Sequence, residues 1–178
     1  MHFFHQGIAR ICVFFLLLTT TFIFPDGFPQ GTYIQTPSGF NTIENLEPGH
    51  EVISFDHLKK IYAKNIVLQR HKQTTQDLLH IHYADNIIKT DAEQRFLDAD
   101  TYTWYPAHAL RVGQHVVADN HTSSTITRID RKQSKQASVL YALSLRDGPH
   151  NFCVTKDKIV AHNIEPVSAL IALYKVFT

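Results

Sequence analysis

The chain has 178 residues, which is long enough for one domain with a hydrophobic core. It carries 17 basic and 16 acidic side chains, and this balance argues against a nucleic-acid-binding protein, which would carry a basic excess. The two cysteines lie in different settings and the twelve histidines show no ligand-like spacing, so we expect no disulfide framework, no metal site and no cofactor.

Residues 1–26 form a distinct N-terminal segment. Residues 11–24, ICVFFLLLTTTFIF, carry no charge. This run suits the apolar core of a signal peptide better than a membrane span, which needs about 20 apolar residues. An uncleaved signal anchor is an alternative because no small-x-small cleavage site follows, and a buried core helix is disfavoured because the run has no polar face. We therefore predict a short hydrophobic helix, membrane association through residues 11–24, and a secreted or membrane-anchored protein.

Residues 27–163 have the pattern of short β-strands. Runs such as HEVISFD, KNIVLQR, STITRIDRK and KIVAHN are rich in β-branched residues and partly alternate between apolar and polar positions. No convincing helical period interrupts them. We predict an all-β domain, either a sandwich or a barrel-like closed structure, because both protect the edges of sheets.

An internal repeat lies within this β-region. The motif L-x-x-G-x-x-V occurs at residues 46–52 and again at residues 110–116, each time before strand-forming residues. The two glycines, Gly49 and Gly113, are 64 residues apart (113 − 49). Similar turn-and-strand units are common in β-proteins, but the two copies favour a duplicated subdomain with pseudo-twofold symmetry.

Residues 164–178 form the last segment. Pro166 stands near an expected helix start, and apolar side chains recur at helical spacing over residues 167–177. We expect a short helix that caps one end of the β-domain. A released peptide or a membrane-seeking segment is less favoured, because Lys175 is the only basic residue available to contact lipid headgroups.

Four blocks carry a resemblance to a known family. In chain order they are GFPQGTYIQTPSGFNTIENLEPGHEVISFD, WYPAHALRVGQHV, LYALSLRDGPHNFCV and KIVAHN. They resemble the opening, middle and last two blocks of the Hint superfamily, which contains inteins, hedgehog autoprocessing domains and bacterial pretoxin Hint domains. The resemblance covers residues 27–163 and implies a flat, horseshoe-like, all-β domain of two related halves. The family's Gly-Asp pairs are altered here to Gly49-His50 and Gly113-Gln114.

By this resemblance, the side-chain amide of Asn163 attacks its own backbone carbonyl, a succinimide forms, and the bond to Ile164 breaks. The reaction needs an oxyanion donor and an acid, because an amide is a poor nucleophile and an amine a poor leaving group. His162 can supply the proton near neutral pH. His150 stands where the family places a second histidine that assists the asparagine. The alternative for the His-Asn pair is a strand end chosen for turn formation.

The sequence departs from the family at the first bond. Gly27 stands in place of the Cys or Ser that performs the N-terminal acyl shift. In the second block Thr90 is present, but Glu93 or Gln94 takes the place of the activating histidine. Ile164 lacks the side-chain nucleophile that splicing requires after the asparagine. Splicing and cholesterol transfer are therefore excluded by this interpretation, and at most single-turnover cleavage after the asparagine remains.

Three function classes follow. The first is a splicing-incompetent Hint domain that still cleaves itself slowly after Asn163. The second is a catalytically dead Hint fold that serves as an exported binding or structural module for an unknown protein partner. The third is an ordinary secreted β-domain. If the fold is Hint-like, we expect Thr90, His150 and His162 to line one cleft, with Asn163 near Gly27.

Overall fold

The computed structural model of the protein describes residues 26–119, 122–146 and 148–162. Within these residues the chain is mostly β-structure, as predicted. The strands are β1 (Phe28–Pro29), β2 (Tyr33–Thr36), β3 (Gly39–Thr42), β4 (Glu51–Asp56), β5 (Ile61–Tyr83), β6 (Asn86–Thr90), β7 (Arg95–Leu97), β8 (Trp104–Pro106), β9 (His115–Val117), β10 (Ser123–Leu145), β11 (Asn151–Val154) and β12 (Ile159–His162), and two short 3-10 helices are η1 (Ile43–Asn45) and η2 (Ala107–Ala109). The hydrophobic helices expected near the two termini lie outside the described residues.

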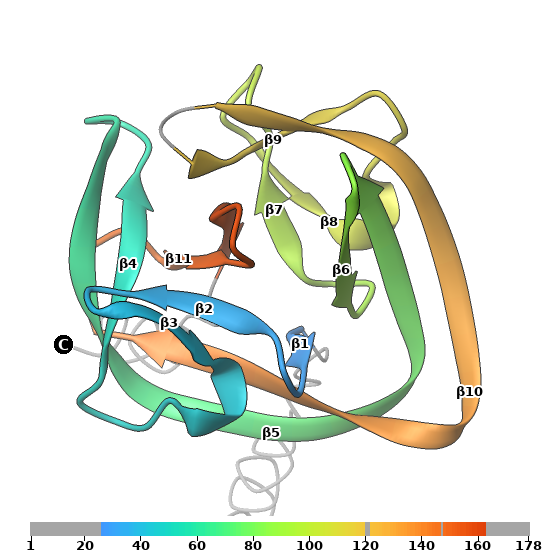
Figure 1. Ribbon diagram of the computed structural model, residues 1–178, viewed down its shortest axis with the longest axis horizontal. Coiled ribbons are helices and arrows are strands. Elements are labelled where there is room, and N and C mark those ends of the chain that lie inside the picture. Colours follow the sequence, from blue (N-terminus) through green and yellow to red (C-terminus); the bar gives the residue numbers. More distant parts are fainter. Residues whose placement is uncertain (1–25, 120–121, 147, 163–178) are drawn as a thin grey trace, which may run out of the picture.

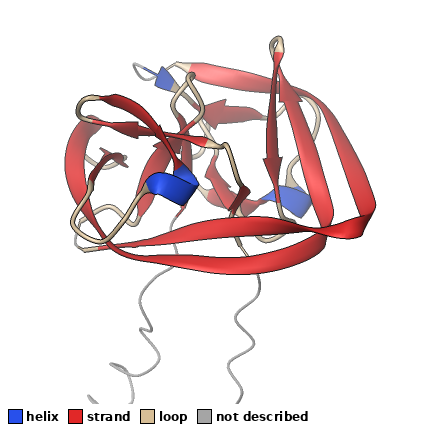
Figure 2. Cartoon of the chain, turned by 60° about the horizontal axis from the view of Figure 1, so that its bottom comes forward, coloured by secondary structure: helices blue, strands red, loops and turns tan. Residues whose placement is uncertain are grey.

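Two long strands give the molecule its horseshoe shape. β5 and β10 each have 23 residues and pair antiparallel along most of their length, with three register shifts that accompany their bends. Figure 1 shows them curving side by side around the outside of the molecule. In Figure 2 the same ribbon forms the bottom and one side of the domain. The path β1-β10-β5-β4, with β6 beside β5 and β9 beside β10, is one sheet, and β3-β2-β11-β12-β7-β8 is the other.

The two copies of the repeat adopt the same local structure. Gly49 N–H donates to Val67 O and Gly113 N–H donates to Ile126 O, both at 2.8 Å. The two glycines have φ angles of 94° and 88°, which residues with a side chain rarely adopt. Each copy follows a 3-10 helix and leads into a strand, β4 or β9, that pairs with a long strand. The predicted duplication is therefore present in the backbone.

The altered Gly-Asp pairs keep a hydrogen-bond acceptor in both copies. His50 Nδ1 accepts from the Glu47 N–H at 3.2 Å, and Gln114 Oε1 accepts from the Arg111 N–H at 3.1 Å. Each bond spans three residues and closes the turn that precedes the strand. Both replacements therefore accept a hydrogen bond within the turn.

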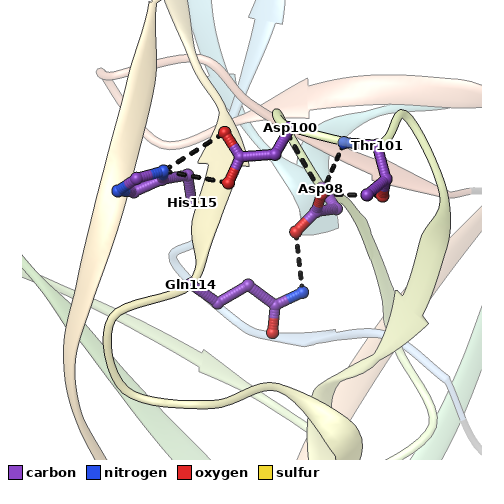
Figure 3. A network of polar contacts seen from close by, with 5 residues as sticks. All are labelled: Asp98, Asp100, Thr101, Gln114 and His115. Atoms are coloured by element: carbon purple, nitrogen blue, oxygen red, sulfur yellow. Dashed lines mark hydrogen bonds and ion pairs between the residues drawn. The ribbon is translucent and has the colours of Figure 1, made fainter.

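The second copy also fixes the turn between β7 and β8 (Figure 3). Gln114 Nε2 donates to Asp98 Oδ2 at 2.8 Å, while Asp98 Oδ1 accepts from the N–H groups of Asp100 and Thr101 and from the Thr101 hydroxyl. Burial opposes ionisation of Asp98, but these hydrogen bonds outweigh it and hold the pKa of the carboxyl below its ordinary value. This turn leads into β8, which begins at Trp104.

The core brings the opening and closing blocks together. Phe28 of β1 packs edge-on against Phe96 of β7 and Phe152 of β11, with ring centroids 6.1 Å apart in both pairs. A smaller cluster contains Cys153, whose thiol is fully buried and whose pKa is raised by burial to about 12. Cys153 is therefore a residue of the hydrophobic core. Among the described residues, no helix is long and apolar enough to cross a membrane.

Candidate functional site

The first residue of the opening block is held by the end of β6. The carbonyl oxygen of Gly27 accepts a hydrogen bond from Thr90 Oγ1 at 2.9 Å and another from the Asp91 N–H at 3.3 Å. Thr90 is fully buried. The structure therefore places Thr90 directly at Gly27, from which it is 63 residues distant in the sequence.

Gln94 joins this region to the last strand. Its side chain is 1% exposed, and Nε2 donates to the carbonyl oxygens of His162 at 2.8 Å and Arg95 at 3.2 Å. Glu93, the other candidate for the missing histidine, lies at the surface with its carboxylate 3.3 Å from His108. Gln94 is therefore the residue of this pair that faces the junction of the two blocks.

His150 and His162 meet on adjacent strands. His162 is paired with Asn151 in the β11–β12 ladder, so that His150 lies next to this pair. Both histidines line an open cleft of about 560 Å³, together with Arg95 and Trp104. The Trp104 ring stands edge-on to the His162 ring, with centroids 5.0 Å apart, and so restricts its rotation.

Thr90 is not among the residues that line the cleft of the two histidines. Thr90 lies at Gly27, and the connection to the cleft runs through Gln94 and the His162 carbonyl. The expectation of one shared cleft is therefore wrong for Thr90. Asn163 lies outside the described residues, so its position relative to the cleft is not described.

Asn151 has a positioning role that sequence reasoning missed. Its side chain is 1% exposed and forms two hydrogen bonds with the backbone of Phe55, Oδ1 accepting from N–H at 2.8 Å and Nδ2 donating to O at 2.9 Å. These bonds attach β11 to β4 and fix the strand that follows His150. The signal was available in the sequence, because a lone asparagine begins the otherwise apolar strand NFCV.

Position 27 has no room for a side chain. A Cβ atom on Gly27 would lie 2.6 Å from the Tyr141 carbonyl oxygen, which belongs to the paired backbone of β10. The φ angle of Gly27 is +143°, a conformation that L-residues rarely adopt. The absence of a nucleophile is thus accompanied by a close contact between backbones.

Two carboxyl groups lie beside Gly27, and sequence reasoning did not identify them. Asp91 is 2% exposed, and burial raises its pKa to about 7. Burial likewise raises the pKa of Asp26 to about 6, against the lowering effect of Arg95. Asp26 Oδ1 and Asp91 Oδ2 are buried and accept no hydrogen bond from the described part of the chain. No local pattern could reveal this pair, because its burial depends on packing between β1, β6 and β7.

The described residues contain no group of three His, Cys, Asp or Glu side chains arranged to hold a metal ion. The side chains that the site offers are histidines in an open cleft and carboxyl groups in a closed junction.

Comparison with known proteins identifies the fold. The pretoxin HINT domain family matches residues 33–164. A bacterial intein-like domain from Clostridium thermocellum superposes with a TM-score of 0.74 at 24% identity, covering 78% of this chain and 99% of that one. The DnaB intein of Synechocystis sp. PCC 6803 gives a TM-score of 0.69 at 18% identity (79% and 99% covered), and the gp41-1 intein 0.62 at 20% (78% and 99%). No curated protein matches the sequence significantly.

Proposed function

The chain belongs to the pretoxin HINT domain family, and from this premise we propose that it is a splicing-incompetent Hint domain that retains slow self-cleavage after Asn163. The observation that carries the proposal is the placement of His150 and His162 in one open cleft while position 27 is closed to any side chain. Residues 1–26 would direct the protein to the membrane or outside the cell, and the domain spans residues 27–163.

The closed position 27 supports the loss of splicing. An acyl shift requires a hydroxyl or thiol on the residue after the scissile bond. Gly27 carries neither, and the contact with Tyr141 O leaves no space for one. Gln94 replaces the activating histidine with an amide, which neither accepts nor donates a proton near neutral pH.

The cleft of the two histidines supports the remaining reaction. The Asn163 side-chain nitrogen would attack its own carbonyl carbon, and the bond to Ile164 would break as a succinimide forms. One proton leaves the attacking nitrogen and one reaches the departing nitrogen of Ile164, and His150 and His162 are the groups at hand to move them. Ile164 is β-branched and crowds the leaving nitrogen, so we expect slow cleavage. A misplacement of about 1 Å can cost roughly a hundredfold in rate.

A catalytically dead module is the second candidate. It is favoured by Gln94, whose two hydrogen bonds to backbone carbonyls are structural. In this case the domain would bind a protein partner outside the cell or at the membrane. The two candidates differ in whether the Asn163–Ile164 bond breaks.

The test is a time course of intact mass on the purified chain between about pH 5 and 8, the range in which histidine changes charge. We expect a fragment that begins at Ile164, abolished by Asn163→Ala and slowed by His162→Ala. His108→Ala is the matched control, because His108 is an exposed histidine paired with Glu93 outside the cleft. If wild type and Asn163→Ala stay equally intact, the domain is the dead module.

A further inference from the structure

The peptide bond between Asp26 and Gly27 is surrounded by groups suited to breaking it. It lies at the start of β1, between the long strand β5 and the end of β6. We propose that the Asp26 carboxylate cleaves this bond by attack on its own main-chain carbonyl, with Asp91 as the proton donor. The domain would thereby release the preceding segment without a nucleophile at position 27.

The attacking group is in place. An aspartate oxygen that bonds to its own carbonyl carbon closes a five-membered ring. Asp26 Oδ1 is buried and accepts no hydrogen bond from the residues that the structure describes. This oxygen is therefore not held by a competing donor.

The carbonyl that would be attacked already has a donor. Gln73 Nε2 donates to the Asp26 carbonyl oxygen at 2.7 Å. Gln73 lies opposite Leu140 in the β5–β10 ladder, and Leu140 is also the partner of Pro29 in β1, so the same ladder fixes donor and acceptor. As the carbon becomes tetrahedral, the negative charge develops on the oxygen that this donor contacts.

The residue that carries the second carboxyl group contacts Gly27, on the leaving side of the bond, through its backbone. Thr90 Oγ1 and the Asp91 N–H both hold the Gly27 carbonyl, so that the Asp91 side chain starts from the backbone next to Gly27. Asp91 Oδ1 accepts from the N–H groups of Glu93 and Gln94, while Oδ2 is buried and accepts no bond from the described chain. The free oxygen is the one that would carry the transferred proton.

The reaction balances with water as the only co-reactant. Asp26 Oδ1 forms a bond to the Asp26 carbonyl carbon, the carbon–nitrogen bond to Gly27 breaks, and the nitrogen takes the Asp91 proton. The product is a cyclic anhydride at Asp26 and a free amine at Gly27. Water then opens the anhydride, one proton returns to Asp91, and the net change is hydrolysis of one peptide bond.

The productive state has Asp26 ionised and Asp91 protonated. Burial raises the pKa of both groups. The charge of Arg95 lowers the pKa of Asp26, and the charge of Glu93 raises it. For Asp91, two backbone hydrogen bonds lower the pKa, and the charges of Asp26 and Glu93 raise it. With pKa values of about 6 and about 7, this state is most populated between them. The rate should therefore peak between about pH 6 and pH 7 and fall on both sides.

The test follows the full chain, with a C-terminal affinity tag, by intact mass and N-terminal sequencing over about pH 4 to 9. The chain contains a second Asp-Gly bond, Asp147–Gly148, which controls for the chemistry of the dipeptide itself. We expect a fragment that begins at Gly27 and none that begins at Gly148. In denaturant, where the fold is lost, this preference should disappear.

Three variants assign the roles. Asp26→Ala should abolish the fragment that begins at Gly27. Asp91→Asn should slow cleavage and remove the fall in its rate above neutral pH. Gln73→Ala should slow cleavage about a hundredfold. Thermal unfolding at a temperature no lower than that of wild type would separate these effects from misfolding. The proposal is overturned if no fragment begins at Gly27, or if both Asp-Gly bonds are cleaved equally. It is also overturned if Asp91→Asn cleaves at the wild-type rate and with the wild-type pH dependence. Loss of one water without chain cleavage would overturn it too, because that change is succinimide formation. The bond differs from Asn163–Ile164, so each reaction can fail without the other.

Discussion

The two ends of the domain are built in opposite ways. At Gly27 the backbone is pressed against β10, the neighbouring groups are buried carboxyls, and there is no space for a side chain. At His162 the strand ends in an open cleft lined by a second histidine and an aromatic ring. Gln94 is the hydrogen-bonded link between the two ends. Under the proposed function, the fold has closed the site of its first reaction and has kept an open site for its last.

The largest effect on stability should come from Asn151→Ala, which lies at the open end of the domain. The change removes both buried hydrogen bonds between the Asn151 side chain and the Phe55 backbone and should cost roughly 3–4 kcal/mol of unfolding free energy. Chemical denaturation measures this value. Asn45→Ala, which removes one exposed hydrogen bond to Thr42, is the matched control and should cost well under 1 kcal/mol. Equal losses would mean that Asn151 does not hold β11 on β4.

The next largest effect tests the closed end through Asp91. The fold raises its pKa from 3.8 to about 7, so the folded state binds the proton more tightly than the unfolded chain. The contribution of Asp91 to stability is therefore greatest at low pH and is lost as pH rises from about 4 to about 7. Asp91→Asn should remove the part of the fall in stability with rising pH that Asp91 causes, leave the part that Asp26 causes, and stabilise the protein by roughly 2–4 kcal/mol at pH 8, measured as unfolding free energy against pH. A stability profile that is flat in wild type would contradict the buried carboxyl.

Gly27→Ala should have a smaller effect on stability. It should separate the cost of the steric contact at position 27 from the cost of a positive φ angle. Both Gly27 and Gly31 have positive φ angles, but a Cβ on Gly31 meets nothing within 4 Å. Gly27→Ala should therefore cost about 1–3 kcal/mol more than Gly31→Ala in thermal or chemical unfolding. For the same reason Gly27→Cys with Gln94→His should not give thiol-dependent cleavage, although the sequence alone suggests that these two changes restore the first step. Such cleavage in the double variant would show that the junction opens readily.

The smallest effect is expected for Glu93→Gln, at the rim of the closed end. Glu93 and His108 are both about half exposed, and such pairs contribute about 0–1 kcal/mol. Chemical denaturation and the rate of cleavage after Asn163 should both stay close to wild type. Gln94→Ala, by contrast, removes a buried donor from the His162 carbonyl and should change both. If Glu93→Gln had the larger effect, Glu93 would be the functional counterpart of the missing histidine.

The repeat and the fold could be predicted because their signals are local. Gly49 and Gly113 each stand in a short turn that requires a positive φ angle, and the glycine of the motif indicates this requirement. The pairing of Gln73 with Asp26, across 47 residues, and the burial of Asp91 could not be predicted, because they arise only when β5, β6 and β1 pack together. The sequence left Glu93 and Gln94 as alternatives for a similar reason, since the turn that Asp91 caps decides which of them faces inward.

The most direct test of the contrast between the two ends is a time course of intact mass on the full chain, held near pH 6.5, midway between the pKa values of Asp26 and Asp91. We expect fragments that begin at Gly27 and at Ile164, each abolished by changing its own aspartate or asparagine, and no product that joins residues 1–26 to residues 164–178. A joined product would contradict the closed junction. A chain that stays whole for days, and equally so in Asp26→Ala and Asn163→Ala, would contradict self-cleavage at either end.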